Sequence, residues 1–259
     1  MDQNERQQLL YQQLEKKILV IDGAMGTMLQ ERNLTADDFG GAALEGCNEN
    51  LVLTRPDVIE DIHKAYLQAG ADIVETNTFG ATPLVLAEYG LETKWHEVNY
   101  EAARIARLAA DALSTADRPR FVAGSMGPTT KAISVTGGIT FDELKENYYQ
   151  QAKGLWEGGV DLLLLETCND TRNVKAALLG INRLKQELGL SKLPIMVSGT
   201  IEPTGTMLGG QNAESLWVSL ADQDLLSVGL NCATGPEFMT DHLRTLHEHA
   251  HTCISCYPN

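Results

Sequence analysis

Positive charge is what this sequence lacks most clearly. Its 20 Lys and Arg residues stand against 35 Asp and Glu, which leaves a formal net charge of −15 at neutral pH. A protein that binds nucleic acid needs a basic face, and anionic membrane surfaces attract basic segments. The charge balance therefore argues against nucleic acid and against a membrane surface as partners.

Long apolar runs are also missing. No run approaches the roughly 20 residues that a helix needs to span a membrane. The N-terminal residues MDQNERQQLLYQQLEKK contain no apolar core of the kind found in signal peptides, and they predict a polar leading helix over residues 1–17. From these features we expect a cytoplasmic protein.

The five cysteines do not form a disulfide framework. Their number is odd and their spacing irregular, so buried thiols are the ordinary expectation, with metal binding or catalysis as the sharper alternatives. Cys253 and Cys256 are three residues apart on a predicted strand and point to opposite faces. His247, His249 and His251 diverge at a predicted helix end. We interpret both motifs as structural.

What the sequence does contain is an alternation of short apolar runs with longer amphipathic segments. One helical segment begins at Pro56 and ends at Gly70, and Thr140 and Glu143 form a capping box ahead of another. Strands separated by helices predict βα units and a parallel sheet. The predicted strands cover residues 18–23, 71–79, 120–128, 160–168, 194–203, 225–233 and 252–259.

Polar residues at the strand ends favour a closed barrel over an open, doubly wound sheet. A barrel gathers the carboxyl ends of all its strands around one mouth, whereas an open sheet gathers only those near its switch point. We therefore predict an α/β fold, a (β/α)8 TIM-type barrel over residues 18–259 that is truncated before the eighth strand. The strand-end residues are Asp22, Glu75, Asn77, Ser125, Glu166, Thr200, Glu202, Asn231, Cys232 and Asn259.

Two strand ends suggest contacts to a small polar ligand. The segment DGAMGT, Asp22 to Thr27, has glycines that allow consecutive backbone N–H groups to point at one carboxylate or phosphate, although it is equally well an ordinary turn. Its spacing fits neither a Walker loop nor a dinucleotide fingerprint. Glu166 follows four consecutive leucines. A carboxylate at that depth is costly without a partner, so it favours a role such as binding an ammonium group.

A third strand end carries a thiol. Cys232 in GLNCATGP follows a predicted strand and precedes a helix. It is a candidate nucleophile or metal ligand, although a buried cysteine without a chemical role is the commoner case.

Several segments together resemble the homocysteine S-methyltransferase family, and within it the N-terminal homocysteine-binding modules of cobalamin-dependent methionine synthases. The resemblance covers residues 17–259, almost the whole chain, and the segment around Thr76-Asn77-Thr78-Phe79 is highly specific. The other segments that carry it are VIDGAMGTMLQ, VAGSMGPTTKAIS, DLLLLET, PIMVSGTI and GLNCATGPEFM.

The resemblance implies a set of site residues. The backbone of Gly23, Ala24 and Met25, with Asp22 nearby, would hold the carboxylate of L-homocysteine, and Glu166 would hold its ammonium group. Cys232 would be one of three thiolate ligands of a zinc ion, and Asn259 would ligate the zinc when substrate is absent. The family's other two thiolates are adjacent cysteines on the last strand, and this sequence has no such pair.

The resemblance also implies the chemistry. A zinc-activated homocysteine thiolate would accept a methyl group from methylcobalamin, ultimately from methyltetrahydrofolate, with cobalamin and folate bound by other modules of the parent enzyme. With one thiolate ligand we expect the chain alone to be inactive. The alternatives are a stand-alone or reductase-fused homocysteine methyltransferase that uses S-methylmethionine or methyl-folate, and a non-catalytic homocysteine-binding fragment. An aldolase-like barrel is disfavoured because no predicted strand ends in lysine.

Overall fold

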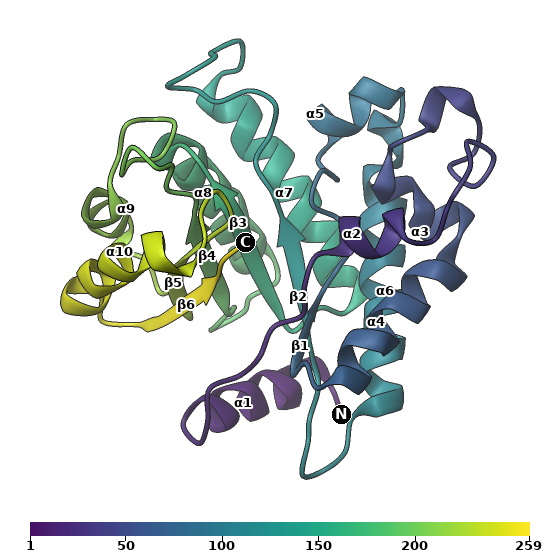
Figure 1. Ribbon diagram of the computed structural model, residues 1–259, viewed down its shortest axis with the longest axis horizontal. Helices are drawn as coiled ribbons and strands as arrows, with labels where there is room; N and C mark the ends of the chain where they lie inside the picture. Colours follow the sequence, from purple (N-terminus) through teal and green to yellow (C-terminus); the bar gives the residue numbers. More distant parts are fainter. The chain divides into compact units, whose positions relative to one another are not determined.

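The computed structural model describes residues 1–259, which form two compact units (Figure 1). The first unit comprises Met1–Ser125 and Lys153–Leu162, and the second comprises Met126–Ala152 and Leu163–Asn259. Both consist of parallel strands and the helices that connect them. No helix is long and apolar enough to cross a membrane.

The first unit contains strands β1 (Ile73–Glu75) and β2 (Phe121–Met126), which pair in parallel with Ile73 opposite Phe121. The strand predicted over residues 18–23 is wrong, because only Ile21 forms an isolated bridge, to Ile73. The Asp72 carboxylate accepts a hydrogen bond from Val20 N at 3.0 Å. In a continuous β-ladder this N–H would instead donate to the backbone of the neighbouring strand. Ile18 is 91% exposed, so that apolar run is not buried as a central strand would be.

Two long helices cover this part of the sheet. Helix α4 (Pro56–Ala69) begins at Pro56 and ends at Gly70, whose φ of 126° suits glycine, as the sequence predicts. It packs against α6 (Trp95–Leu113), and both also contact β1. Their apolar faces supply Ile59, Ile62, Val98 and Ala102 to the core. The packing of these helices therefore follows their amphipathic pattern.

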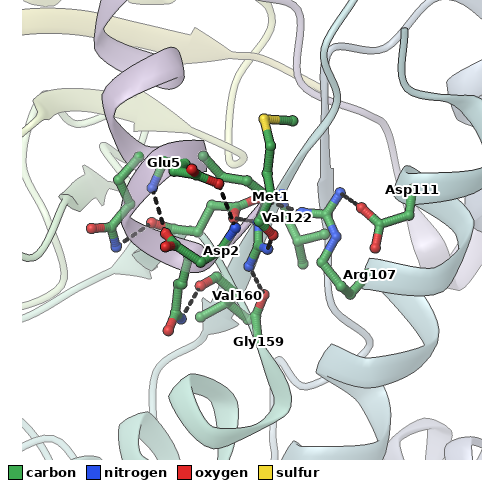
Figure 2. A network of polar contacts seen from close by, with 12 residues as sticks. Met1, Asp2, Glu5, Arg107, Asp111, Val122, Gly159 and Val160 are labelled. Carbon is green, nitrogen blue, oxygen red and sulfur yellow. Dashed lines mark hydrogen bonds and ion pairs between the residues drawn. The ribbon is translucent and has the colours of Figure 1, made fainter.

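The leading helix α1 (Gln3–Leu14) buries Leu10 completely and is also held by a cluster of ion pairs (Figure 2). The Asp161 carboxylate is completely buried and accepts from Arg6 Nε at 2.5 Å and from Arg107 Nη1 at 2.6 Å. Gln3 and Gln7 donate to the carbonyl oxygens of Val160 and Asp161. The polar composition of α1 thus matches the polar surface on which it lies.

Short helices occupy the segment between the first turn and α4. Leu29, Leu51 and Val52 are buried in the core and order the chain around them. The elements are α2 (Met25–Gln30), η1 (Ala42–Leu44), η2 (Asn48–Asn50) and α3 (Leu51–Thr54), followed after β1 by α5 (Pro83–Leu86), η3 (Ala87–Tyr89) and η4 (Glu92–Lys94).

The second unit contains four parallel strands in chain order. They are β3 (Leu162–Cys168), β4 (Ile195–Gly199), β5 (Ser227–Asn231) and β6 (Cys253–Tyr257). The register between β3 and β4 shifts between Leu165 and Cys168, where β3 reaches its carboxyl end. Strands β3, β4 and β5 are almost entirely buried, as expected for strands covered on both faces.

Helices α7 (Phe141–Gly158), α8 (Thr171–Glu187), α9 (Ala213–Leu220) and α10 (Pro236–His249) alternate with the strands. The predicted capping box is confirmed: Thr140 Oγ1 accepts from Glu143 N, and Thr140 N donates to the Glu143 carboxylate at 2.8 Å. Parallel strands that alternate with helices in chain order are the architecture of a (β/α) barrel. The predicted fold class is confirmed, with six strands in place of the seven expected.

Candidate functional site

The turn that follows the Ile21 bridge is fixed from two sides. Both carboxylate oxygens of Asp22 lie 3.1 Å from Glu75 N and accept its hydrogen, which ties the turn to the end of β1. Tyr66 on α4 donates its hydroxyl to the Ala24 carbonyl at 3.2 Å. A Cβ at Gly23 would lie 3.0 Å from that hydroxyl oxygen, so the close approach of Tyr66 favours glycine here. Asp22 therefore shapes the turn.

The same turn presents backbone donors. Gly23 and Ala24 are exposed, and Met25 is the first residue of α2, whose N-cap makes no side-chain hydrogen bond. N–H groups in the first turn of a helix have no partner inside the helix. Backbone donors of this kind suit a carboxylate.

The end of β1 carries a second group of polar residues in the first unit. Thr76 Oγ1 accepts from Ser125 N at 3.0 Å, and Asn77 Nδ2 donates to the Asn48 carbonyl at 2.7 Å. Glu49 accepts from Gly80 N at 2.8 Å, and desolvation raises the pKa of its carboxyl group. Sequence reasoning missed Glu49, because a glutamate between two asparagines gives no signal of burial.

In the second unit, the end of β3 places Glu166 and Thr167 together. Glu166 is 6% exposed, as its position after four leucines predicted. Thr167 has a φ of 53°, a left-handed conformation that a β-branched residue rarely adopts and that costs about 1–3 kcal/mol. The next residue, Cys168, is buried, and burial raises the pKa of its thiol. Strained backbone of this kind is concentrated at functional sites.

The end of β5 is strained in the same way. Cys232 and Ala233, which follow its last residue Asn231, have φ values of 58° and 55°. The Cys232 thiol is half-buried, and its sulfur lies 3.9 Å from Thr167 Oγ1 and 3.1 Å from Asn231 Nδ2. The thiol is thus accessible to solvent and positioned by two polar contacts, whereas a cysteine that only fills the core would have neither property.

The remaining sequence-predicted residues take different positions. Asn259 is exposed and donates its backbone N–H to the Thr234 carbonyl at 3.3 Å, two residues beyond Cys232. Cys253 and Cys256 are free and exposed on β6, whereas the sequence led us to expect buried thiols. Their exposure follows from the position of β6, which pairs with β5 on one side and is only partly covered.

The donor set for a metal can be tested on these residues. No group of three or more His, Cys, Asp or Glu side chains is arranged to hold a metal ion. The Cys232 sulfur is partly accessible and accepts the Asn231 amide N–H at 3.1 Å. Zinc sites in proteins have at least three protein ligands, so these residues do not form a complete zinc site.

Comparison with known proteins gives consistent matches. The sequence profile of the family described as homocysteine S-methyltransferase matches residues 19–259. The methionine synthases of Mycobacterium leprae (strain TN) and Mycobacterium tuberculosis (strain ATCC 25618 / H37Rv) are each 44% identical to this chain, over 250 and 246 residues. These alignments cover 96% and 95% of the chain but only 20% of each relative, so the chain spans about a fifth of their length.

Solved structures resemble the fold. The metallated form of the homocysteine methyltransferase MmuM from Escherichia coli aligns with a TM-score of 0.80 at 24% identity, over 96% of this chain and 86% of that one. The oxidized form aligns with a TM-score of 0.79 at the same identity, over 95% and 84%. At this identity the likeness supports the fold, and a relative with this fold has been seen with a metal bound.

Proposed function

Because the chain belongs to the homocysteine S-methyltransferase family, we propose that it is the homocysteine-binding part of a methionine synthase, in which homocysteine accepts a methyl group from methylcobalamin and ultimately from methyltetrahydrofolate. The observation that carries this proposal is the half-buried Cys232 thiol, held at the end of β5 beside Thr167, which follows the buried Glu166. Five free cysteines fit the reducing cytoplasm in which we place the enzyme.

The polar groups at the strand ends are assigned to the two ends of the amino acid. The backbone N–H groups of Gly23, Ala24 and Met25 would bind the substrate carboxylate, with Asp22 fixing the turn. The Glu166 carboxylate would bind the ammonium group, because a buried carboxylate gains most from a cationic partner. In this assignment the negative carboxylate of homocysteine meets hydrogen-bond donors and its positive ammonium group meets a carboxylate.

Cys232 is proposed as one thiolate ligand of a zinc ion whose other two thiolates lie outside these residues. Asn259 is the proposed ligand in the absence of substrate, on the basis of its backbone contact to Thr234 near Cys232. Zinc, when bound, supplies a charge that favours the deprotonated form of a coordinating thiol.

The reaction needs the substrate thiol as its thiolate. A free thiol has a pKa near 8.5, so only a few per cent is ionised at pH 7. The substrate sulfur then forms a bond to the methyl carbon while the bond between that carbon and its donor breaks. In this step the chain's own residues bind and orient homocysteine. Cobalamin and folate would bind elsewhere in the enzyme, since the mycobacterial relatives are about five times as long.

A shorter homocysteine methyltransferase with a small methyl donor is the second candidate. The observation in its favour is that the chain covers 84% to 86% of the MmuM structures but a fifth of the methionine synthases. The higher identity to the methionine synthases favours the first proposal.

Two substitutions in the complete polypeptide that contains these residues test the assignment. Glu166→Gln is expected to weaken homocysteine binding at least 10-fold in calorimetry while zinc content is unchanged, because the substitution removes only the charge that faces the ammonium group. Cys232→Ala is expected to abolish zinc retention after dialysis. The matched controls are Glu237→Gln on the exposed start of α10 and Cys253→Ala on β6, and neither should change binding. Unaltered homocysteine affinity in Glu166→Gln would remove that residue from the site.

A further inference from the structure

The side chain of Asn231 makes more polar contacts than that of any other residue at the two strained strand ends. It is fully buried at the end of β5. Its Oδ1 accepts from Thr167 N at 3.0 Å and from Ser198 Oγ at 2.7 Å. Its Nδ2 donates to Thr167 Oγ1 at 2.8 Å and to Cys232 Sγ at 3.1 Å. One amide therefore connects residues of β3, β4 and β5.

The orientation of this amide follows from its partners. A backbone N–H can only donate, so the atom that faces Thr167 N must be the carbonyl oxygen Oδ1. The opposite edge of the amide, with its two hydrogens, must then face Thr167 Oγ1 and the Cys232 sulfur. A flipped amide would leave the partly buried Thr167 N–H opposite another donor, which is costly. The sulfur thus receives an N–H donor.

This contact suits a thiolate better than a neutral thiol. A neutral thiol sulfur is a weak acceptor, whereas hydrogen bonds to an ionised acceptor are shorter and stronger. The same amide holds Thr167 and lies next to Cys232, and both of those residues are in the left-handed conformation. Such strain persists only where surrounding contacts over-determine the backbone, and the Asn231 amide provides contacts of that kind at both positions.

We propose that Asn231 is a positioning residue that joins the ammonium-binding end of β3, Glu166–Thr167, to the zinc-binding thiol of Cys232. Homocysteine carries its ammonium group and its sulfur on one short chain, so the two groups that receive them must keep a fixed separation. Asn231 keeps it by holding both through one rigid amide. This inference rests on the proposed function, because it assigns Glu166 and Cys232 the roles given there.

The test substitutes Asn231 by a side chain of the same shape. Asn231→Asp in the complete polypeptide keeps an acceptor for Thr167 N and Ser198 Oγ but replaces the Nδ2 donor by a carboxylate oxygen next to the Cys232 sulfur. Ser198→Ala is the matched control, because it removes one partner of the same amide and leaves the N–H to sulfur contact. The measurements are the rate at which a chelator removes zinc and the Kd of homocysteine from calorimetry.

Asn231→Asp is expected to raise both the zinc release rate and the homocysteine Kd about 10- to 100-fold, the usual effect of losing a residue behind a metal ligand. Ser198→Ala should change each by less than about 3-fold. A double-mutant cycle adds a readout that a general loss of packing would not produce. If Asn231 joins the two groups, Glu166→Gln should cost much less homocysteine affinity in the Asn231→Asp background than in the wild type.

Each outcome decides one question. Equal, small effects of Asn231→Asp and Ser198→Ala, or additive effects of Glu166→Gln and Asn231→Asp, would overturn the inference and leave the proposed function standing. If wild-type protein binds neither zinc nor homocysteine, the proposed function fails and the inference fails with it. Should Asn231→Asp not fold, Thr167→Ala removes only the Oγ1 partner of the amide, and an unchanged zinc release rate in that variant would overturn the inference.

Discussion

At the scale of single residues, His63 is the clearest departure from ordinary chemistry. It lies on α4 with an exposure of 0%, and neither ring nitrogen has a hydrogen-bond partner. Desolvation lowers its pKa from 6.5 to about 4, with Glu60 opposing the shift. The imidazole is therefore neutral in the folded protein at physiological pH, and it occupies the core as an apolar side chain would.

This burial makes α4 sensitive to acid. Between pH 6.5 and about pH 4 the unfolded segment binds a proton at His63 that the folded segment does not. The free energy of unfolding of α4 is therefore highest above pH 6.5 and decreases as the pH falls toward 4. The loss reaches roughly 3 kcal/mol, from about 1.4 kcal/mol for each pH unit. His63→Leu should remove this dependence, measured as hydrogen exchange of α4 peptides, corrected for the intrinsic exchange rate, at pH 7 and pH 4.5.

The control for this experiment is His247→Gln, since that histidine is exposed on α10 and its substitution should leave the acid sensitivity of α4 unchanged. An equal loss of α4 protection at pH 4.5 in wild type and His63→Leu would show that other groups are responsible.

At the scale of elements, one buried carboxylate makes a large contribution to the attachment of α1. Asp161 is buried between Arg6 and Arg107 and also accepts from Val122 N at 2.9 Å. Asp161→Asn keeps the shape of the side chain but removes the anion that pairs with Arg6 and the buried one of the two anions that pair with Arg107, whose other partner is the exposed Asp111. Breaking a buried pair in this way costs about 3–5 kcal/mol, so α1 should lose hydrogen-exchange protection over residues 3–14.

Asp142→Asn is the comparison, because Asp142 forms an exposed pair with Lys145 on α7. Exposed pairs contribute little, so protection of α7 and α1 should not change. Full protection of α1 in Asp161→Asn would mean that the glutamine contacts and the buried Leu10 are enough to hold the helix.

A second element-scale prediction concerns the segment between β2 and α7. Asp170 is completely buried, caps α8 through Arg172 N at 2.9 Å, and accepts from Ser134 N at 2.7 Å and Ser134 Oγ at 3.1 Å. Asp170→Ala should therefore raise hydrogen exchange in residues 131–136 as well as at the start of α8. Asn212→Ala, which removes the cap of α9 at Ser215 N, should loosen α9 only. Unchanged exchange in residues 131–136 of Asp170→Ala would contradict this role.

At the scale of the whole molecule, the methyl donor distinguishes the two candidate functions. The complete polypeptide, supplied with zinc and homocysteine, is expected to form methionine from methylcobalamin and not from S-methylmethionine, because its methionine synthase relatives are 44% identical over nearly the whole chain. Methionine formed from S-methylmethionine alone would instead support the shorter methyltransferase. The measurement is chromatographic quantification of methionine, with Cys232→Ala as the inactive control.

Much of the architecture follows from local sequence. The alternation of apolar runs and amphipathic segments predicted βα units and a parallel sheet, because the burial of each element sets its own pattern of apolar residues. The polar residues at the strand ends then favoured a barrel. Pro56, Gly70 and the Thr140–Glu143 capping box marked helix ends by chemistry contained within a few residues. Glu166 and Cys232 were identifiable as site candidates because an acid after four leucines and a cysteine after a strand are unusual in themselves.

Other features depend on contacts between residues far apart in the chain. The run from Ile18 to Gly23 fails to form a strand because Asp72, about 50 residues later, accepts the Val20 N–H. Asn231 looks like an ordinary strand-end residue until folding brings Thr167, 64 positions away, within 3.0 Å of its amide. By itself the sequence determined most of the strands and helices and which strand-end residues are candidates for a site, since those properties are local. Only the tertiary structure decided which polar atoms meet, because a hydrogen bond depends on positions in space that packing of the whole chain creates.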